Sequence, residues 1–281
     1  MSKVAVVHEW LVTYAGSEKA LEQILNLFPE ADLFCVIDYL PHNHRGVIGK
    51  HKVTTTFIQS LPLYGNYYRL YLPLMPFAIS RLNLSGYDVI ISSSHAVAKG
   101  IKTHNQQIHI SYTYSPMRYA WDLRDQYLAE SNLDKGIKGM LAKWMLAKLR
   151  DWDYRVAQNV SHFIAISRYI QTRILQNYGR GSAVIYPPVD TDFYKPGGIK
   201  EDFYLTASRM VPYKMIPLVV SAFSEMPEKQ LVVIGDGPEM DKVRDAAGQN
   251  IEILGYKDDK VLRDYMQRAR CFVFAAEEDF G

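Results

Sequence analysis

The sequence predicts an α/β protein with two Rossmann-like domains, each built on a parallel sheet, of which the second is incomplete. Three observations support this prediction. Short runs rich in β-branched residues alternate with amphipathic helical patterns along the whole chain, an order that is typical of βαβ units. A stretch rich in proline and glycine, residues 185–198, interrupts the alternation once, and the alternation then starts again. Four strand patterns follow it, whereas a doubly wound domain usually has about five or six strands.

Hydrophobic periodicity predicts the elements of the first domain. Its apolar runs predict strands at residues 3–8, 32–37, 88–93, 108–112 and 162–166. Helices are predicted at residues 17–28, 135–158 and 168–178, and residues 64–84 are expected to be helical in short pieces. In the first helix, Leu21, Ile24, Leu25 and Phe28 recur at i, i+3, i+4 and i+7, so they form one apolar face.

The same pattern continues beyond the interruption. Strands are predicted at residues 203–207, 230–234, 251–254 and 271–275, and helices at residues 214–225, 239–247 and 259–269. We therefore expect a first domain at residues 1–187, a linker at residues 188–200 and a second domain at residues 201–281. Because the chain ends directly after the last strand pattern, we expect the second domain to be truncated at its C-terminus.

The composition is that of an ordinary globular protein. A formal net charge of +2 gives no reason to expect a nucleic-acid partner. The two cysteines, Cys35 and Cys271, both lie in apolar runs, which predicts buried free thiols and suits a reducing cytoplasm. The longest apolar region, residues 70–79, is broken by Pro73 and Pro76 and is not expected to cross a bilayer.

Two candidate functional residues occur in the first domain. Gly16 directly precedes a predicted helix, where a glycine lets the backbone approach a ligand and the helix N-terminus attracts phosphate. The plain alternative is a tight turn with Ser17 as the N-cap. His95 follows a predicted strand, and functional residues of parallel sheets gather beyond the carboxyl ends of strands. A histidine there can donate a hydrogen bond or carry a proton, or it can simply cap the next helix.

In the second domain, cations and carboxylates follow the predicted strands. Arg209 and Lys214 lie five residues apart after the first strand, and two cations at a strand end suit a diphosphate leaving group. Gly235 and Asp236 begin a glycine-rich turn after the second strand, which is also explained by packing geometry alone. Glu278 belongs to three consecutive carboxylates after the last strand, where they could bind sugar hydroxyls or remain solvated loop charges.

Taken together, these motifs resemble family 4 retaining glycosyltransferases, especially bacterial mannosyltransferases that build surface polysaccharides. The resemblance covers essentially the whole chain. It rests on HEWL at residues 8–11 with Gly16, on Ser94 and His95, on SPMRYAWD at residues 115–122, on PPVD at residues 187–190, on Ser208 and Arg209 with Lys214, on GDGP at residues 235–238, and on EDFG at residues 278–281. Each motif alone is weak, whereas the set in this order is specific.

The resemblance implies the two-domain GT-B architecture and a metal-independent transfer of a hexose, expected to be mannose from GDP-mannose. It assigns catalytic roles to His95, Arg209, Lys214 and Glu278, with the two cations holding the donor diphosphate in place of a metal ion or other cofactor. Donor binding is expected at Gly16, Arg209, Lys214, Gly235, Asp236, Glu278, Phe280 and Gly281. Arg118 and Tyr119 are expected on the acceptor side.

The sequence departs from the family pattern at two places. Ala15 stands beside Gly16, where the family usually has paired glycines. The second glutamate of the family's E-x7-E motif would fall eight positions after Glu278, beyond the last residue, Gly281. We therefore keep two alternatives open: a truncated, non-catalytic relative that binds nucleotide or acceptor, and another GT-B enzyme such as a sugar-nucleotide epimerase.

A basic amphipathic helix indicates contact with a membrane. Residues 135–150 contain five lysines and arginines and no acid, and one helical face is expected to carry Leu141, Trp144, Met145, Leu149 and Trp152. Such a helix suits an anionic membrane surface, and a lipid-linked acceptor would explain the need for it. A core-packed helix with solvated lysines explains the pattern equally well. We expect a cytoplasmic protein that contacts the inner face of the plasma membrane through residues 135–152.

Overall fold

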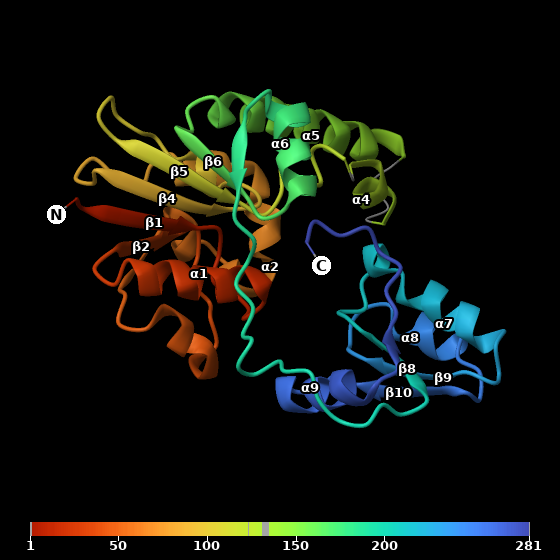
Figure 1. The fold of residues 1–281 in the computed structure, drawn as a ribbon. Helices are drawn as coiled ribbons and strands as arrows, with labels where there is room; N and C mark the ends of the chain where they lie inside the picture. Colours follow the sequence, from red (N-terminus) through yellow and green to blue (C-terminus); the bar gives the residue numbers. More distant parts are fainter. Residues whose placement is uncertain (1, 123, 131–134, 281) are drawn as a thin grey trace. The chain divides into compact units, whose positions relative to one another are not determined.

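The computed structural model describes residues 2–122, 124–130 and 135–280. Its contacts divide the chain into two compact units. The first, called the first domain below, comprises Met1–Pro188 with Asp279–Gly281, and the second domain comprises Val189–Glu278. The second therefore includes the expected linker except for Pro188, whereas Asp279 and Phe280 belong to the first. Both are α/β units (Figure 1).

Within the described residues, the first domain contains a seven-stranded parallel sheet in the order β3-β2-β1-β4-β5-β6-β7. Its strands are β1 (Val4–His8), β2 (Asp32–Cys35), β3 (Val53–Thr55), β4 (Val89–Ser94), β5 (Ile108–Thr113), β6 (His162–Ala165) and β7 (Ser182–Val184). Figure 1 shows β2, β1, β4, β5 and β6 side by side in this order. Because parallel strands are buried on both faces, they form apolar runs, and the five predicted strands are confirmed.

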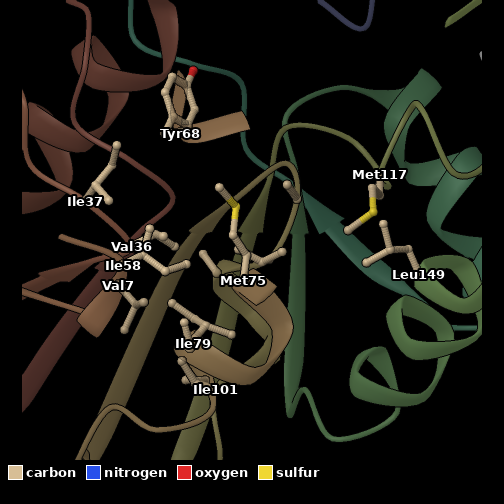
Figure 2. Close-up of a cluster of buried hydrophobic side chains, with 14 of the residues drawn as sticks. Val7, Val36, Ile37, Ile58, Tyr68, Met75, Ile79, Ile101, Met117 and Leu149 are labelled. Atoms are coloured by element: carbon tan, nitrogen blue, oxygen red, sulfur yellow. The ribbon is translucent and has the colours of Figure 1, made fainter. Parts of the chain in front are cut away.

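Helices cover both faces of this sheet. They are α1 (Gly16–Leu27), α2 (Tyr64–Tyr67), α3 (Met75–Ile79), α4 (Arg124–Glu130), α5 (Gly136–Ala157) and α6 (Arg168–Tyr178), with 3-10 helices η1 (His42–Ile48), η2 (Phe57–Ser60), η3 (Tyr68–Leu74) and η4 (Ala98–Gly100). The alternation along β1 shows the two faces, because Val6 packs with α1 whereas Ala5 and Val7 pack with α3 and α5. Figure 2 shows the buried side chains on the face covered by α3 and α5, with Val7 near Ile79.

Sequence periodicity missed the shortest strands of the first sheet. The edge strands β3 and β7 each have three residues, which is too short for a recognisable pattern. The expectation that residues 64–84 are helical in pieces is confirmed, because α2, η3 and α3 follow one another there. Pro73 lies inside η3 and Pro76 is the second residue of α3, and proline does not fit the interior of a longer helix.

The second domain repeats this architecture on a smaller scale. Its described strands form a four-stranded parallel sheet in the order β10-β9-β8-β11. The elements are β8 (Phe203–Ala207), η5 (Pro212–Lys214), α7 (Ile216–Ser224), β9 (Gln230–Ile234), α8 (Met240–Asp245), β10 (Ile251–Gly255), α9 (Asp259–Arg268) and β11 (Cys271–Phe272). Cys35 is buried, as expected, but the prediction for Cys271 is wrong. Its strand β11 pairs with one neighbour and both of its residues are exposed.

Candidate functional site

Buried polar side chains gather at the carboxyl ends of β1 and β4. These neighbouring parallel strands pair with His8 opposite Ser93, so the residues after each strand lie at one edge of the sheet. His8 Nδ1 is 2.9 Å from Ser93 Oγ, which is itself 2.9 Å from the hydroxyl of Tyr114, the residue after β5. The predicted site residue His95 follows β4 at this same edge.

The most unusual group at this edge is the carboxylate of Glu9, which is fully buried. Its Oε1 accepts hydrogen bonds from Ser94 Oγ and from the backbone N–H groups of residues 95 and 96, at 2.6 to 3.1 Å. Its Oε2 accepts from the backbone N–H groups of residues 97 and 98, at 2.8 and 3.1 Å. Burial alone would raise the pKa of Glu9, but the electrostatic interaction with the His95 imidazole, these N–H donors and the charge of Lys99 together lower it. Glu9 is therefore an internal carboxylate anion that gathers the loop after β4.

The His95 imidazole is partly buried at this edge. It packs edge-on against the Trp10 ring, with ring centroids 4.9 Å apart and an interplanar angle of 89°. Desolvation lowers the pKa of His95 below its ordinary value of 6.5, and the nearby Glu9 carboxylate opposes this shift without cancelling it. The imidazole is therefore mainly neutral at neutral pH and can either donate or accept a hydrogen bond.

A second buried carboxylate holds the loop between β1 and α1. Glu18 Oε2 accepts a hydrogen bond of 2.9 Å from the backbone N–H of Ala15, the N-cap residue, and Oε1 is 3.4 Å from His8 Nε2. Burial opposes ionisation, but the hydrogen bond and charge of His8 outweigh it and lower the pKa of Glu18. The N-cap is thus not Ser17. Gly16 begins α1, is exposed, and a Cβ built there would meet no heavy atom within 4 Å. This space is wide enough for a ligand to approach the backbone.

The two expected acceptor-side residues follow β5. Arg118 Nη2 is 2.7 Å from one carboxylate oxygen of Asp279, and Arg173 Nη1 is 2.8 Å from the other oxygen. Arg118 is therefore ion-paired within the first domain. Tyr119 lies deeper: its hydroxyl is buried, has no hydrogen-bond partner among the described residues, and has a pKa that burial raises well above 10.0.

In the second domain, two predicted site residues come into contact. Lys214, the last residue of η5, forms an ion pair with Glu278, and both side chains are mostly buried. The Lys214 ammonium also lies 5.3 Å from the centre of the Phe274 ring. Arg209, in the loop after β8, is exposed, and within the described chain its guanidinium forms no ion pair or hydrogen bond. The carboxyl edge of this sheet therefore has one cation that is paired and one that is available for an anionic ligand.

Gly235 and Gly237 allow the loops after β8 and β9 to touch through their main chains. Both glycines have a positive φ, +136° and +154°. A Cβ on Gly235 would lie 1.8 Å from the Ser208 carbonyl oxygen, and one on Gly237 would lie 2.4 Å from that of Met210. The Met210 N–H also donates to the Asp236 carbonyl oxygen at 2.9 Å. The packing explanation for this turn is therefore sufficient for both glycines, and Asp236 contributes its backbone.

The predicted site residues fall into two groups. The first domain holds Gly16, His95, Arg118, Tyr119 and Phe280, and the second holds Arg209, Lys214, Gly235, Asp236 and Glu278. The ring of Phe280 lies 6.0 Å from that of Tyr186, also in the first domain. Gly281 lies outside the described residues.

A buried ion pair that the sequence predictions do not include lies behind the loop after β4, residues 95–98, called the His95 loop below. Lys99 Nζ in η4 is 2.5 Å from Asp153 Oδ1 in α5, and both side chains are fully buried. Asp153 Oδ2 accepts hydrogen bonds from Trp121 Nε1 at 2.9 Å and from the Tyr178 hydroxyl at 2.7 Å. The sequence does contain a signal that Asp153 is buried, because it lies on the same helical face as the apolar residues Leu146 and Leu149.

Comparison with known proteins gives one family match and several solved structures of similar fold. Residues 202–281, almost the whole second domain, match the family Glycosyl transferases group 1. No curated protein matches the chain. Among solved structures, Anabaena HepE in complex with UDP and glucose is similar, with 17% identity, a TM-score of 0.62, and coverage of 99% of this chain and 76% of that chain.

Two further structures share the fold. Sucrose-phosphate synthase from Thermosynechococcus elongatus has 15% identity and a TM-score of 0.63, over 99% of this chain and 77% of that chain. A mutant of S. aureus TarM in complex with fondaparinux, α-GlcNAc-glycerol and UDP has 11% identity and a TM-score of 0.62, over 100% and 82% of the two chains. The expected two-domain α/β fold is confirmed, and the match of residues 202–281 to Glycosyl transferases group 1 supports the expected enzyme class, a glycosyltransferase.

Proposed function

We propose that the chain is a retaining, metal-independent glycosyltransferase of family 4 that moves a hexose from a sugar nucleotide to a glycan or lipid-linked acceptor. The observation that carries this proposal is the position of Arg209 and Lys214 within the region that matches the group 1 family. Both follow β8, at the carboxyl edge of a parallel sheet, where nucleotides bind in doubly wound domains.

The two cations suit the leaving group of such a reaction. A nucleoside diphosphate gains negative charge as the bond to the sugar breaks, and preorganised cations stabilise that charge. Arg209 can hold phosphate oxygens with two N–H groups at once, whereas Lys214 supplies a compact charge. The pairing of Lys214 with Glu278 would also place sugar hydroxyls bound by Glu278 next to the diphosphate.

In the first domain, the neutral imidazole of His95 would contact the transferred sugar, and the open space at Gly16 would admit phosphates or the acceptor. We propose mannose from GDP-mannose as the donor. The main alternative donor is UDP-glucose, because HepE of the same fold has been crystallised with UDP-glucose. Calorimetric titration of the protein with a panel of GDP- and UDP-sugars, followed by transfer assays with the donors that bind, decides between these donors.

Substitution of the cations tests the site directly. Arg209→Ala or Lys214→Ala should lower turnover about 100-fold or more, because each removes preorganised stabilisation of the leaving group. The matched control is Arg244→Ala, which removes an exposed arginine of α8 in the same domain and should leave turnover unchanged. EDTA should have little effect.

Three results would contradict this proposal. Strict dependence on Mg²⁺ or Mn²⁺ would refute the metal-independent mechanism. Donor binding without transfer to any acceptor would favour a non-catalytic binding protein. Interconversion of one sugar nucleotide into its epimer would favour the epimerase.

We also propose that the first domain contacts an anionic membrane through α5. In the described part of the chain, no helix is long and apolar enough to cross a membrane. The expected single apolar face is wrong, because Leu149 is buried and Met145 and Trp152 pack against the core. The exposed apolar face instead consists of Ile137, Met140, Leu141 and Trp144, which are 59% to 82% exposed.

This exposed face has the spacing and the charge of a membrane-binding helix. Its four residues recur at i, i+3, i+4 and i+7, so they share one side of α5, and the buried residues Ala142, Leu146 and Leu149 occupy another. The exposed lysines Lys138 and Lys148 lie on the same helix. Apolar side chains can enter the boundary of the lipid chains while lysines remain among anionic headgroups.

Vesicle co-sedimentation tests the membrane contact. The protein should bind phosphatidylglycerol vesicles at low salt and dissociate as salt screens the lysines. Trp144→Glu should abolish this binding, whereas Leu175→Glu should retain it, because Leu175 is an equally exposed apolar residue on α6. Equal binding to neutral and anionic vesicles, or full binding by Trp144→Glu, would remove the proposal.

A further inference from the structure

Glu9 has no role in the proposed transfer reaction, yet the fold buries its carboxylate completely. We infer that Glu9 is a positioning residue, which fixes the backbone of the His95 loop and thereby the place of the imidazole. This inference rests on the proposed function, because it matters for transfer only where His95 contacts the sugar. Its structural part can be tested without any substrate.

The hydrogen bonds show what Glu9 does. A buried carboxylate is costly unless donors compensate it, and within the described chain five donors converge on this one. Four of them are consecutive backbone N–H groups, those of residues 95 to 98. Such groups must find partners when they are buried, and one carboxylate can serve all four only if the loop curves around it. The loop therefore takes its shape from Glu9.

The neighbours of Glu9 act on the same segment of chain. His8 contacts Ser93, Glu9 contacts Ser94 and the His95 N–H, and Trp10 packs edge-on against the His95 ring. These contacts follow one another along both segments because β1 and β4 are parallel, with His8 opposite Ser93. The two residues that follow β1 thus fix His95, Glu9 through its main chain and Trp10 through its ring.

The other side of the loop is also fixed. Lys99 Nζ donates a hydrogen bond of 3.0 Å to the Ala96 carbonyl oxygen and pairs with Asp153 in α5. The Ala96 peptide is thus held from its N–H by Glu9 and from its carbonyl by Lys99. Because Lys99 and Asp153 still attach the Ala96 carbonyl to α5, a change at Glu9 should loosen the loop locally without unfolding the domain.

Several titratable groups lie near the His95 ring. They determine whether a substitution at Glu9 raises or lowers the pKa of His95. Burial and, to a smaller extent, His8 in β1 and Lys99 in η4 lower the pKa of His95, whereas Glu9, which follows β1, and Glu18 in α1 raise it. Replacing Glu9 by glutamine removes one of the raising groups. The protonation midpoint of His95 should therefore move to lower pH.

Hydrogen exchange measured by mass spectrometry tests the geometry. Glutamine keeps the shape of Glu9 but places an NH₂ group against donors, so some of the amides of residues 95–98 lose their acceptor. In Glu9→Gln these amides should exchange at least about tenfold faster, while those of β4 and β5 keep their protection. The control Tyr178→Phe, which removes a buried hydrogen bond to Asp153 in the same domain, should leave residues 95–98 protected.

Two further readouts separate positioning from simple destabilisation. By NMR, the His95 imidazole midpoint should move to lower pH in Glu9→Gln but stay near that of the wild type in Glu9→Asp, which keeps the charge. With an active donor, Glu9→Gln should lower kcat by about 10- to 100-fold and change the donor KM by less than about twofold. The activity of Glu9→Gln should also persist to lower pH than that of the wild type, because its His95 imidazole stays neutral to lower pH.

Unchanged exchange of residues 95–98 in Glu9→Gln would overturn the inference, and so would an unchanged His95 midpoint. A loosened loop combined with an unchanged kcat would show that loop position does not matter for transfer. If no sugar nucleotide supports transfer by the wild type, the proposed function fails, while exchange and NMR still decide the role of Glu9 in the loop.

Discussion

Replacing Gly16 by alanine separates the structural reading of this glycine from the functional one. A Cβ at Gly16 would meet no heavy atom within 4 Å, and the residue is not among those with positive φ. The substitution therefore introduces neither a clash nor backbone strain. It should stabilise the first domain by about 0.4–1 kcal/mol, because alanine has less conformational freedom than glycine in the unfolded chain. For a domain of this size, Tm should rise by about 1–4 °C.

The expected effect on activity has the opposite sign. If donor phosphates or the acceptor approach the backbone at Gly16, the added methyl group occupies part of that space. A loss of about 1.4–2.8 kcal/mol corresponds to a 10- to 100-fold lower kcat/KM. Gly86→Ala is the control, because that residue also has open space around it and no positive φ, but it lies before β4, at the opposite edge of the sheet.

Differential scanning fluorimetry and steady-state kinetics on the two variants provide the assay. Both should be at least as stable as the wild type, and only Gly16→Ala should lose activity. A fully active Gly16→Ala enzyme would show that no substrate approaches this position. A clearly destabilised variant would show that Gly16 does not begin α1 in an open, unstrained conformation.

Three further predictions follow from buried groups. Lys99→Met or Asp153→Asn should each cost about 3–5 kcal/mol in chemical denaturation, because each leaves the partner charge buried alone, and the double variant should cost less than the sum. Gly237→Ala should destabilise the second domain by about 2–5 kcal/mol, with at least about 8 °C lost in Tm, because its Cβ would lie 2.4 Å from a carbonyl oxygen at a positive φ. The pKa of Glu9 is lower in the folded state than its ordinary value of 4.5, so its contribution to stability is present above about pH 4.5 and disappears as pH falls through the folded-state pKa; acid titration followed by circular dichroism should show a weaker loss in Glu9→Gln.

Most of the fold could be predicted because parallel strands have a simple sequence pattern. The predicted β8 and β9 coincide with those of the structure, and so does α6. The errors occur where tertiary contacts override local pattern. One apolar helical face was predicted for α5, but packing against η4 partly buries Trp152 beside Gly100 and leaves Trp144 exposed. Periodicity records which residues are apolar but not which of two faces meets the core.

The candidate site could be predicted only in part, for a related reason. Motif order pointed to Lys214 and Glu278, and the structure joins them in an ion pair. The roles of Glu9 and Lys99 could not be inferred, because their partners are backbone groups or residues that lie 54 to 89 positions away in the chain. Contacts of that kind follow from strand register and helix packing, which a linear pattern does not encode.

The main-chain contact between the loops after β8 and β9 limits how the second domain can be re-engineered. Because Gly235 lies against the Ser208 carbonyl, an insertion in either loop forces a matching change in the other. A mutant library that varies loop length at this edge should therefore yield mostly unfolded clones. Libraries that keep both backbones and exchange only outward side chains, such as that of Arg209, should remain folded and are the practical route to altered donor preference.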